Sequence, residues 1–198
     1  VECYPETDEV VQRFKLDHEI TGQKRLPAIT AGDGYVFVGT IPDSGLNGGA
    51  VTSYNTTTGE YRWKRHIVQD QSPISLAYHD GIVYCGMSRS GGDGAQVVAG
   101  SALIAAYDYQ KDEVLATLDV RDHIKGLASP VGNIYGVTAD PNVAENGRIW
   151  AIVSETLFCF TFDKETKKFD VQEVISFNKS LYSTTSAVNR QAKTLYFD

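Results

Sequence analysis

Short apolar runs rich in Val, Ile, Tyr and Phe alternate along this chain with Gly, Asn and Asp, and helical periodicity is hard to find. β-Branched and aromatic residues favour strands, whereas Gly, Asn and Asp favour the turns between them. Asp33-Gly34 and Asp80-Gly81 each separate two apolar runs, and both pairs tolerate the positive φ of a type I′ hairpin turn. Asn146-Gly147, which follows an insertion over residues 141–145, is expected to form a third such turn. The pattern predicts an all-β protein built from antiparallel hairpins.

One sequence segment of this pattern, which we call the repeated line, occurs three times. It reads YNTTTGEYRW at residues 54–63, YDYQKDEV at residues 107–114 and FDKETKKF at residues 162–169. From Tyr54 to Tyr107 is 53 residues, and from Tyr107 to Phe162 is 55 residues. Similarity at a fixed period of this size indicates a repeat architecture, in which a single unit cannot bury its apolar face alone.

Alignment on the turns and on the repeated line predicts three units of four strands, at residues 26–67, 73–120 and 125–177. The expected strands are residues 27–32, 35–40, 50–54 and 61–67 in the first unit, 74–79, 82–87, 102–107 and 113–120 in the second, and 135–139, 148–154, 156–162 and 169–175 in the third. Two half units flank them. Residues 1–17 resemble a turn between third and fourth strands followed by a strand over 10–16, and residues 184–198 contain expected strands at 186–189 and 194–197.

Four antiparallel strands per repeat, arranged radially, form the blade of a β-propeller. Over most of its length the sequence resembles the propellers of the PQQ-repeat (quinoprotein-like) group, most strongly over residues 50–64. There, residues 55–63 (NTTTGEYRW) are similar to that group's motif of an acidic residue or Asn followed by Thr-Gly and then Trp. The two later copies carry neither the Gly nor the Trp. The resemblance implies that Trp63 is structural and wedges between blades. We expect no cofactor, because a quinone needs a complete larger propeller and an adjacent acidic metal site.

The two half units leave two ways to complete the propeller. They can join to close a four-bladed ring, or the chain can be a segment of a larger propeller whose further blades cover the open edges, since unpaired edge strands promote aggregation. The chain opens at Val1 directly on strand-like sequence. We therefore expect a processed polypeptide or a part of a longer one, located outside the cytoplasm or secreted.

Charge and cysteine content narrow the range of partners. A net charge of -7 with a pI near 5.1 disfavours nucleic acid, which requires a basic surface to replace counterions. The longest apolar run is far shorter than the roughly 18 residues that span a bilayer. Cys3, Cys85 and Cys159 lie far apart without metal-ligand spacing, and we expect free, buried thiols.

Candidate site residues gather in the segments that join one unit to the next. Because strand direction alternates, these connections lie at the same end of each sheet as the loops between second and third strands, residues 41–49 and 88–100. A His occurs at or near the end of the fourth strand in three successive units, at His18, His66 and His123. First strands are innermost in propellers, so the connections would descend toward a central channel. The candidate ligand-binding residues are His18, Arg25, His66, Asp70, Arg121, His123 and Lys125. The competing interpretation is that these polar residues simply solvate the loops.

Several further motifs do not predict a metal, phosphate or hydrolase site. Imidazoles from three units could meet a metal on the axis, but they have no diagnostic local spacing, and no metal site is predicted. A calcium loop at Asp140, Asn142 and Glu145 lacks the Gly-centred spacing of an EF-hand. Residues 91–94 (GGDG) lack the Lys-Ser/Thr of a phosphate loop, and a flexible surface loop is expected instead. The sequence contains no Gly-x-Ser-x-Gly elbow.

Two hypotheses of function follow. The first is a non-catalytic propeller that acts as a scaffold and recognises a protein or a glycan on its loop-rich face. The alternative is an extracellular polysaccharide lyase or hydrolase acting on an acidic sugar. In that alternative, His66 or His123 would act as the base, and Arg25, Arg121 or Lys125 would neutralise a uronate carboxylate.

Overall fold

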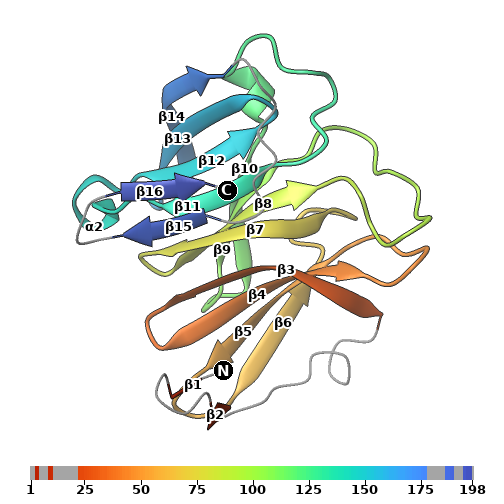
Figure 1. Cartoon of the computed structure of the whole chain (residues 1–198), viewed down its shortest axis with the longest axis vertical. Coiled ribbons are helices and arrows are strands. Elements are labelled where there is room, and N and C mark those ends of the chain that lie inside the picture. The colour runs from red at the N-terminus through yellow and green to blue at the C-terminus, as the bar shows by residue number, and fades with distance from the viewer. Residues whose placement is uncertain (1–2, 5–8, 11–21, 178–185, 190–193, 198) are drawn as a thin grey trace.

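The computed structural model describes residues 3–4, 9–10, 22–177, 186–189 and 194–197, and it shows an all-β protein. Three four-stranded antiparallel sheets lie side by side and two short hairpins accompany them (Figure 1). The first sheet contains β3 (Gln23–Gly32), β4 (Tyr35–Pro42), β5 (Ala50–Asn55) and β6 (Tyr61–Arg65); the second contains β7 (Ser72–His79), β8 (Ile82–Ser88), β9 (Ile104–Asp108) and β10 (Glu113–Leu118); the third contains β11 (Tyr135–Ala139), β12 (Ile149–Val153), β13 (Thr156–Asp163) and β14 (Lys168–Ser176). The hairpins are β1 (Cys3–Tyr4) with β2 (Glu9–Val10), and β15 (Ser186–Asn189) with β16 (Thr194–Phe197).

Each sheet is a simple meander, because strand order in space follows strand order in the chain. The registers of the first two sheets correspond: Tyr35 pairs with Asn55 in the first, and Ile82 pairs with Asp108 in the second. The four-stranded antiparallel units expected from the sequence are confirmed. Within the described residues, helical structure is limited to the 3₁₀ turn η1 (Val120–Asp122) and the single turn α2 (Val143–Asn146). No helix of this part of the chain combines the length and apolar character of a membrane span.

The predicted hairpin turns are confirmed in two sheets and wrong in the third. Asp33 and Gly34 have φ of 49° and 77°, and Asp80 and Gly81 have 48° and 78°, as type I′ geometry requires. In the third sheet, Asn146 instead ends α2, and Gly147 caps that helix with φ of 64° while its N–H donates to the Val143 carbonyl. The inserted residues are long enough to complete a helical turn, so the Gly occupies the position that follows a helix C-terminus.

The line that recurs in the sequence is a turn between third and fourth strands with a fixed hydrogen-bond pattern. In each copy one side-chain oxygen accepts bonds of 2.8–3.1 Å from the backbone N–H groups two and three residues later; these acceptors are Asn55, Asp108 and Asp163. The residue four positions after each acceptor is left-handed; these residues are Gly59, Asp112 and Lys167, with φ of 74°, 56° and 55°. The later copies therefore keep the turn without the Gly, because the Asx acceptor is the element that they share.

The first strands of successive sheets are neighbours. β7 contacts β3 and β4, β11 contacts β7 and β8, and β15 contacts β11. Figure 1 shows the second sheet between the other two, with the β15–β16 hairpin beside β11. The middle sheet is therefore covered on both faces.

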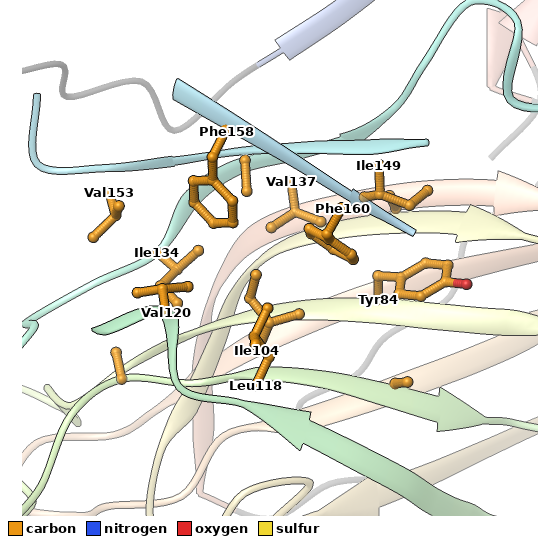
Figure 2. Packing of buried hydrophobic residues seen from close by; sticks show 14 of the residues in the cluster. Tyr84, Ile104, Leu118, Val120, Ile134, Val137, Ile149, Val153, Phe158 and Phe160 are labelled. Atoms are coloured by element: carbon orange, nitrogen blue, oxygen red, sulfur yellow. The ribbon is translucent and has the colours of Figure 1, made fainter. Parts of the chain in front are cut away.

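Strand β8 shows how one apolar run serves two cores. Val83, Cys85 and Met87 pack in the cluster between the first and second sheets, whereas Ile82 and Tyr84 pack in the cluster between the second and third. Alternate side chains of a strand point to opposite faces, so a strand covered on both faces must be apolar throughout. Figure 2 shows the second cluster, in which the second sheet faces the third through Tyr84, Ile104, Leu118, Ile149, Phe158 and Phe160.

Two of the three cysteines are buried free thiols, as expected, and Cys85 packs between the first and second sheets. Cys85 and Cys159 are both buried and neither forms a disulfide. Burial raises the pKa of the Cys85 thiol well above its usual range, so this side chain acts as a small apolar group. The structure describes the backbone of Cys3 and not its side chain.

Candidate functional site

The long loops between second and third strands lock together at one end of the sheets. Residues 43–49 of the first sheet and 89–103 of the second form the surface that we call the loop-rich end. Gly45 N–H donates to the Asp93 carbonyl, and Gly92 N–H donates to the Leu46 carbonyl, each over 2.9 Å. Asn47 Nδ2 adds a bond of 2.9 Å to the Gln96 carbonyl. Reciprocal backbone bonds of this kind give the two loops one shared conformation.

Gly91 and Gly92 allow this close approach. A Cβ on Gly92 would lie 1.9 Å from the Asp43 carbonyl oxygen, and a Cβ on Gly91 would lie 2.2 Å from Leu46 O and from Asn47 Oδ1. The expectation of a flexible surface loop over residues 91–94 is therefore wrong for this Gly pair. Its two residues are buried and are required because neighbouring backbone leaves no space for a side chain.

His66 and Asp70 are two predicted site residues that the structure brings together. Both lie in the connection from β6 to β7 and both are left-handed, with φ of 55° and 59°. Asp70 N–H donates to His66 Nδ1 over 3.3 Å, and Asp70 Oδ1 lies 3.4 Å from the same nitrogen. Because Nδ1 accepts the backbone bond, the ring proton of the neutral imidazole lies on Nε2. Gly48 permits the arrangement, since a Cβ there would lie 2.4 Å from His66 Cε1.

The two predicted guanidinium groups are already paired with carboxylates. Arg25 lies 3.2 Å from Asp93 Oδ1, which joins β3 to the loop of the second sheet. Arg121 binds Asp119 through Nε and Nη2 and donates from Nη1 to Ser129 Oγ over 3.0 Å. The Arg121 bonds hold the pKa of Asp119 below its usual range, and Asp119 in turn raises the pKa of Arg121. Neither cation is left with its charge uncompensated.

The remaining candidates are not drawn into a common centre. His123 follows η1 and Lys125 lies two residues further, and both are exposed. His18 lies outside the described residues. Across the described chain, no set of three His, Cys, Asp or Glu side chains is placed to hold a metal ion. Asp140, a residue of the calcium loop considered from the sequence, accepts hydrogen bonds from Asn142 N, Asn146 Nδ2 and Trp150 Nε1.

Two buried glutamines that sequence reasoning missed hold the base of the loop-rich end. Gln23 donates to the Gly48 carbonyl over 3.3 Å and accepts from Thr40 Oγ1 over 2.6 Å. Gln71 donates to the Ser101 carbonyl over 2.8 Å and accepts from Leu103 N–H over 3.2 Å. The two glutamines are 48 residues apart, the same spacing as His18 and His66, and this repeat of a polar residue at the start of a first strand is the signal that could have identified them.

A second feature, a pocket of about 260 Å³, lies at the opposite end of the sheets. We call it the seam pocket, because it opens between the first and second sheets beside the turn that follows β9. Its lining consists of Tyr35, Ser53, Asn55, Glu60, Arg62, Tyr109 and Gln110. None of these residues was predicted from the sequence as a site residue.

The chain was compared with protein-family models and with curated proteins. No family model matches it, and no curated protein matches it.

Proposed function

We propose that this chain is a β-propeller, or a segment of one, that acts as a non-catalytic binding module and recognises a protein through its loop-rich end. The propeller arrangement is supported by the order of contacts, in which each first strand meets the first strand of the next sheet. It is also supported by the outer face of the first sheet, where Ile29 and Trp63 stay exposed at the two ends of one row across the strands, with Thr52 buried between them. A further blade, from this chain or from a longer one, would cover such a row.

The observation that carries the binding role is the locked pair of loops. Leu46 and Val97 belong to these loops, and their exposed fractions are 45% and 59%. The ion pairs Lys24–Asp43 and Arg25–Asp93 lie at the same end. A surface that is already ordered loses little conformational entropy on binding, and apolar residues beside charged ones are typical of protein interfaces. Of the two ligand classes expected from the sequence, these features favour a protein over a glycan.

The polysaccharide-active enzyme has less support. That hypothesis needs an imidazole base beside a cation that is available to a uronate carboxylate. Arg25 and Arg121 are each compensated by an Asp, and His66 has Asp70 beside it. An acidic sugar would have to compete with these carboxylates, so we do not propose catalysis.

Site-directed photo-cross-linking tests the binding role. A photoreactive residue at Val97 should give one discrete adduct in extracts of the source cells, and the same residue at exposed Glu165, at the other end of the third sheet, should not. The adduct partner is then purified, and its Kd for the chain is measured. The double variant Leu46→Asp, Val97→Asp should bind about tenfold or more weakly, whereas Glu165→Lys should bind normally. Equal affinity of the two variants, or no saturable partner, would overturn the proposal.

A further inference from the structure

The seam pocket is built from one face of the first sheet. Alternate residues of a strand share a face, so Ser53 and Asn55 on β5 and Arg62 on β6 point the same way, as does Tyr35 on β4. Phe37 and Val51, further along this face, are fully buried against the second sheet. The face is thus apolar toward the middle of the sheet and becomes polar at the turn end. Tyr109 and Gln110 close the pocket from the second sheet.

The neighbouring seam supplies an internal comparison. By strand register, Tyr35 and Ser53 correspond to Ile82 and Ala106 in the second sheet. By its distance from the turn, Arg62 corresponds to Leu115, which lies at a register shift in β10. Those three residues pack in the cluster shared with the third sheet. The same architecture therefore closes one seam with apolar side chains and leaves the other as a polar pocket. Because the fold does not require polar groups at these positions, the seam pocket calls for another explanation.

Two opposite charges in the pocket lack ion-pair partners within the described residues. Glu113, which corresponds to Glu60, pairs with Lys167 across its seam at 2.7 Å. Glu60 forms no such pair in the described chain; its carboxylate has one long contact of 3.5 Å from Thr58 Oγ1. No hydrogen bond or ion pair joins Arg62 to another described residue, although its charge lies near enough to Asp112 and Tyr107 to lower their pKa values. Within the described residues, the hydrogen-bonding groups of Glu60 and Arg62 can therefore still serve a ligand that donates to the first and accepts from the second.

Aromatic groups complete the lining. The rings of Tyr35 and Tyr109 lie 4.9 Å apart and are tilted by 59°, and Tyr109 is held in place because Phe37 meets its ring edge-on at 4.8 Å. The Tyr109 hydroxyl accepts a bond from Gln110 Nε2. Tyr109 is only 4% exposed, so the half-buried ring of Tyr35 supplies the apolar surface of the pocket beside its polar groups.

We propose that the seam pocket binds a neutral sugar ring. Sugar hydroxyls both donate and accept, so one ring can donate to Glu60 and accept from Arg62 while its C–H face lies against the ring of Tyr35. The pocket carries one acid and one base, so a ligand without net charge matches it better than a uronate. This site lies at the opposite end of the sheets from the loops proposed to bind protein, and it does not depend on that function.

Ligand-observed saturation-transfer NMR tests the site with glucose, galactose, mannose and N-acetylglucosamine as probes. At millimolar concentration, at least one probe should receive saturation on its ring C–H protons. The variant Ser53→Ala, Arg62→Leu, which copies the composition of the neighbouring seam, should bind it about tenfold or more weakly. Its thermal unfolding should match or exceed that of the parent chain, and Lys168→Leu, an exposed change on the third sheet, should leave binding intact.

Three results would overturn the proposal. They are no saturation transfer to any sugar, equal transfer in the Ser53→Ala, Arg62→Leu variant, and selective binding of the zwitterions alanine or phenylalanine in place of every sugar. The variant Leu46→Asp, Val97→Asp separates this site from the protein-binding surface, because it should lose the protein partner and retain the sugar.

Discussion

The phenol oxygen of Tyr78 lies 2.5 Å from Asp33 Oδ2 and joins the first hairpin turns of two neighbouring sheets. Tyr78 is on β7 of the second sheet, and Asp33 is in the turn between β3 and β4 of the first. The same phenol oxygen accepts a bond of 3.0 Å from Gly81 N–H in its own turn. Burial, together with the bond to Asp33, raises the pKa of Tyr78 well above its usual value. One side chain therefore fixes the spacing of two sheets at their turn end.

The variant Tyr78→Phe should lower the free energy of unfolding by about 1–2 kcal/mol. The ring contacts remain, but Asp33 loses a donor and Gly81 N–H loses an acceptor. Urea unfolding followed by circular dichroism measures the change. Asp33→Asn is the matched control, because Asn tolerates the left-handed turn position and still presents an oxygen to the phenol. A double-mutant cycle of Tyr78→Phe with Asp33→Gly, which removes the carboxylate and tolerates the left-handed position, should show coupling; strict additivity would show that the contact does not stabilise the fold.

Raised tyrosine pKa values predict a loss of stability in alkali. Burial is the main cause of the raised pKa of Tyr78, Tyr84 and Tyr107, with Asp112 adding to the effect at Tyr107. A folded pKa above the unfolded value of about 10 means that the stabilisation is complete below pH 10 and is lost as the pH rises above it. The free energy of unfolding in urea should therefore fall from about pH 10 upward. Tyr78→Phe should fall less steeply, and an identical slope would exclude a contribution from that phenol.

Local sequence was enough to predict the strands and two hairpin turns. Asp33-Gly34 and Asp80-Gly81 carry their geometry in the dipeptide itself, since both residues tolerate positive φ. Asn146-Gly147 fails the same test because its neighbours can form a helical turn, and the Gly then serves that helix. A dipeptide therefore predicts a turn only where the flanking residues already pair as strands.

The sites were harder to predict because they depend on contacts between distant residues. Arg25 was predicted to bind a ligand, but its partner Asp93 lies 68 residues away. Sequence alone does not reveal that pairing, nor does it show that Gly92 packs on the Asp43 carbonyl. The seam pocket was missed because Ser53 and Arg62 have ordinary strand contexts. Their significance appears only when Ala106 and Leu115 are seen to fill the equivalent seam.

Gly32 should be intolerant of any side chain. A Cβ at this position would lie 1.9 Å from Tyr78 Cδ1, and the ring is held by its bonds to Asp33 and Gly81. Gly32→Ala should therefore lower the free energy of unfolding by about 1–3 kcal/mol through overpacking. The control is Gly132→Ala, where a Cβ meets nothing within 4 Å, and it should be neutral or slightly stabilising. Chemical denaturation of both variants decides the matter, and equal midpoints would contradict the close packing of the sheets here.

Substitutions at Gly59, the left-handed position of the repeated turn, should destabilise the chain in the order of their backbone conformational cost. Gly59 has φ of 74°. A Cβ added there would lie no closer than 3.8 Å to another residue's atom, Tyr54 Oη, so space is available. Gly59→Ala should lower the free energy of unfolding by about 1 kcal/mol, because the left-handed conformation disfavours a Cβ. Gly59→Asn should lower it less, because Asn adopts that conformation more readily. Thermal melts of the two variants should preserve this order, and a reversed order would show that contacts, not backbone strain, determine the effect.

Asp140 makes the third sheet sensitive to acid, and Trp150 reports on it. Although burial raises the pKa of Asp140, hydrogen bonds from Trp150 Nε1, Asn142 N and Asn146 Nδ2 hold it below the usual value. The stabilisation is therefore present above the unfolded pKa of about 3.9 and is lost as the pH falls through the folded value.

In the variant Trp63→Phe, the fluorescence emission of the remaining Trp150 should change in that pH range as the Asp140 carboxylate is protonated. Asp140→Asn in the same background should flatten the acid transition and lower the free energy of unfolding by about 1–3 kcal/mol at neutral pH, because a charge-assisted bond of 2.7 Å is replaced by a weaker one. An unchanged acid transition in this variant would mean that other carboxylates, such as Asp119 with its Arg121 partner, control unfolding in acid.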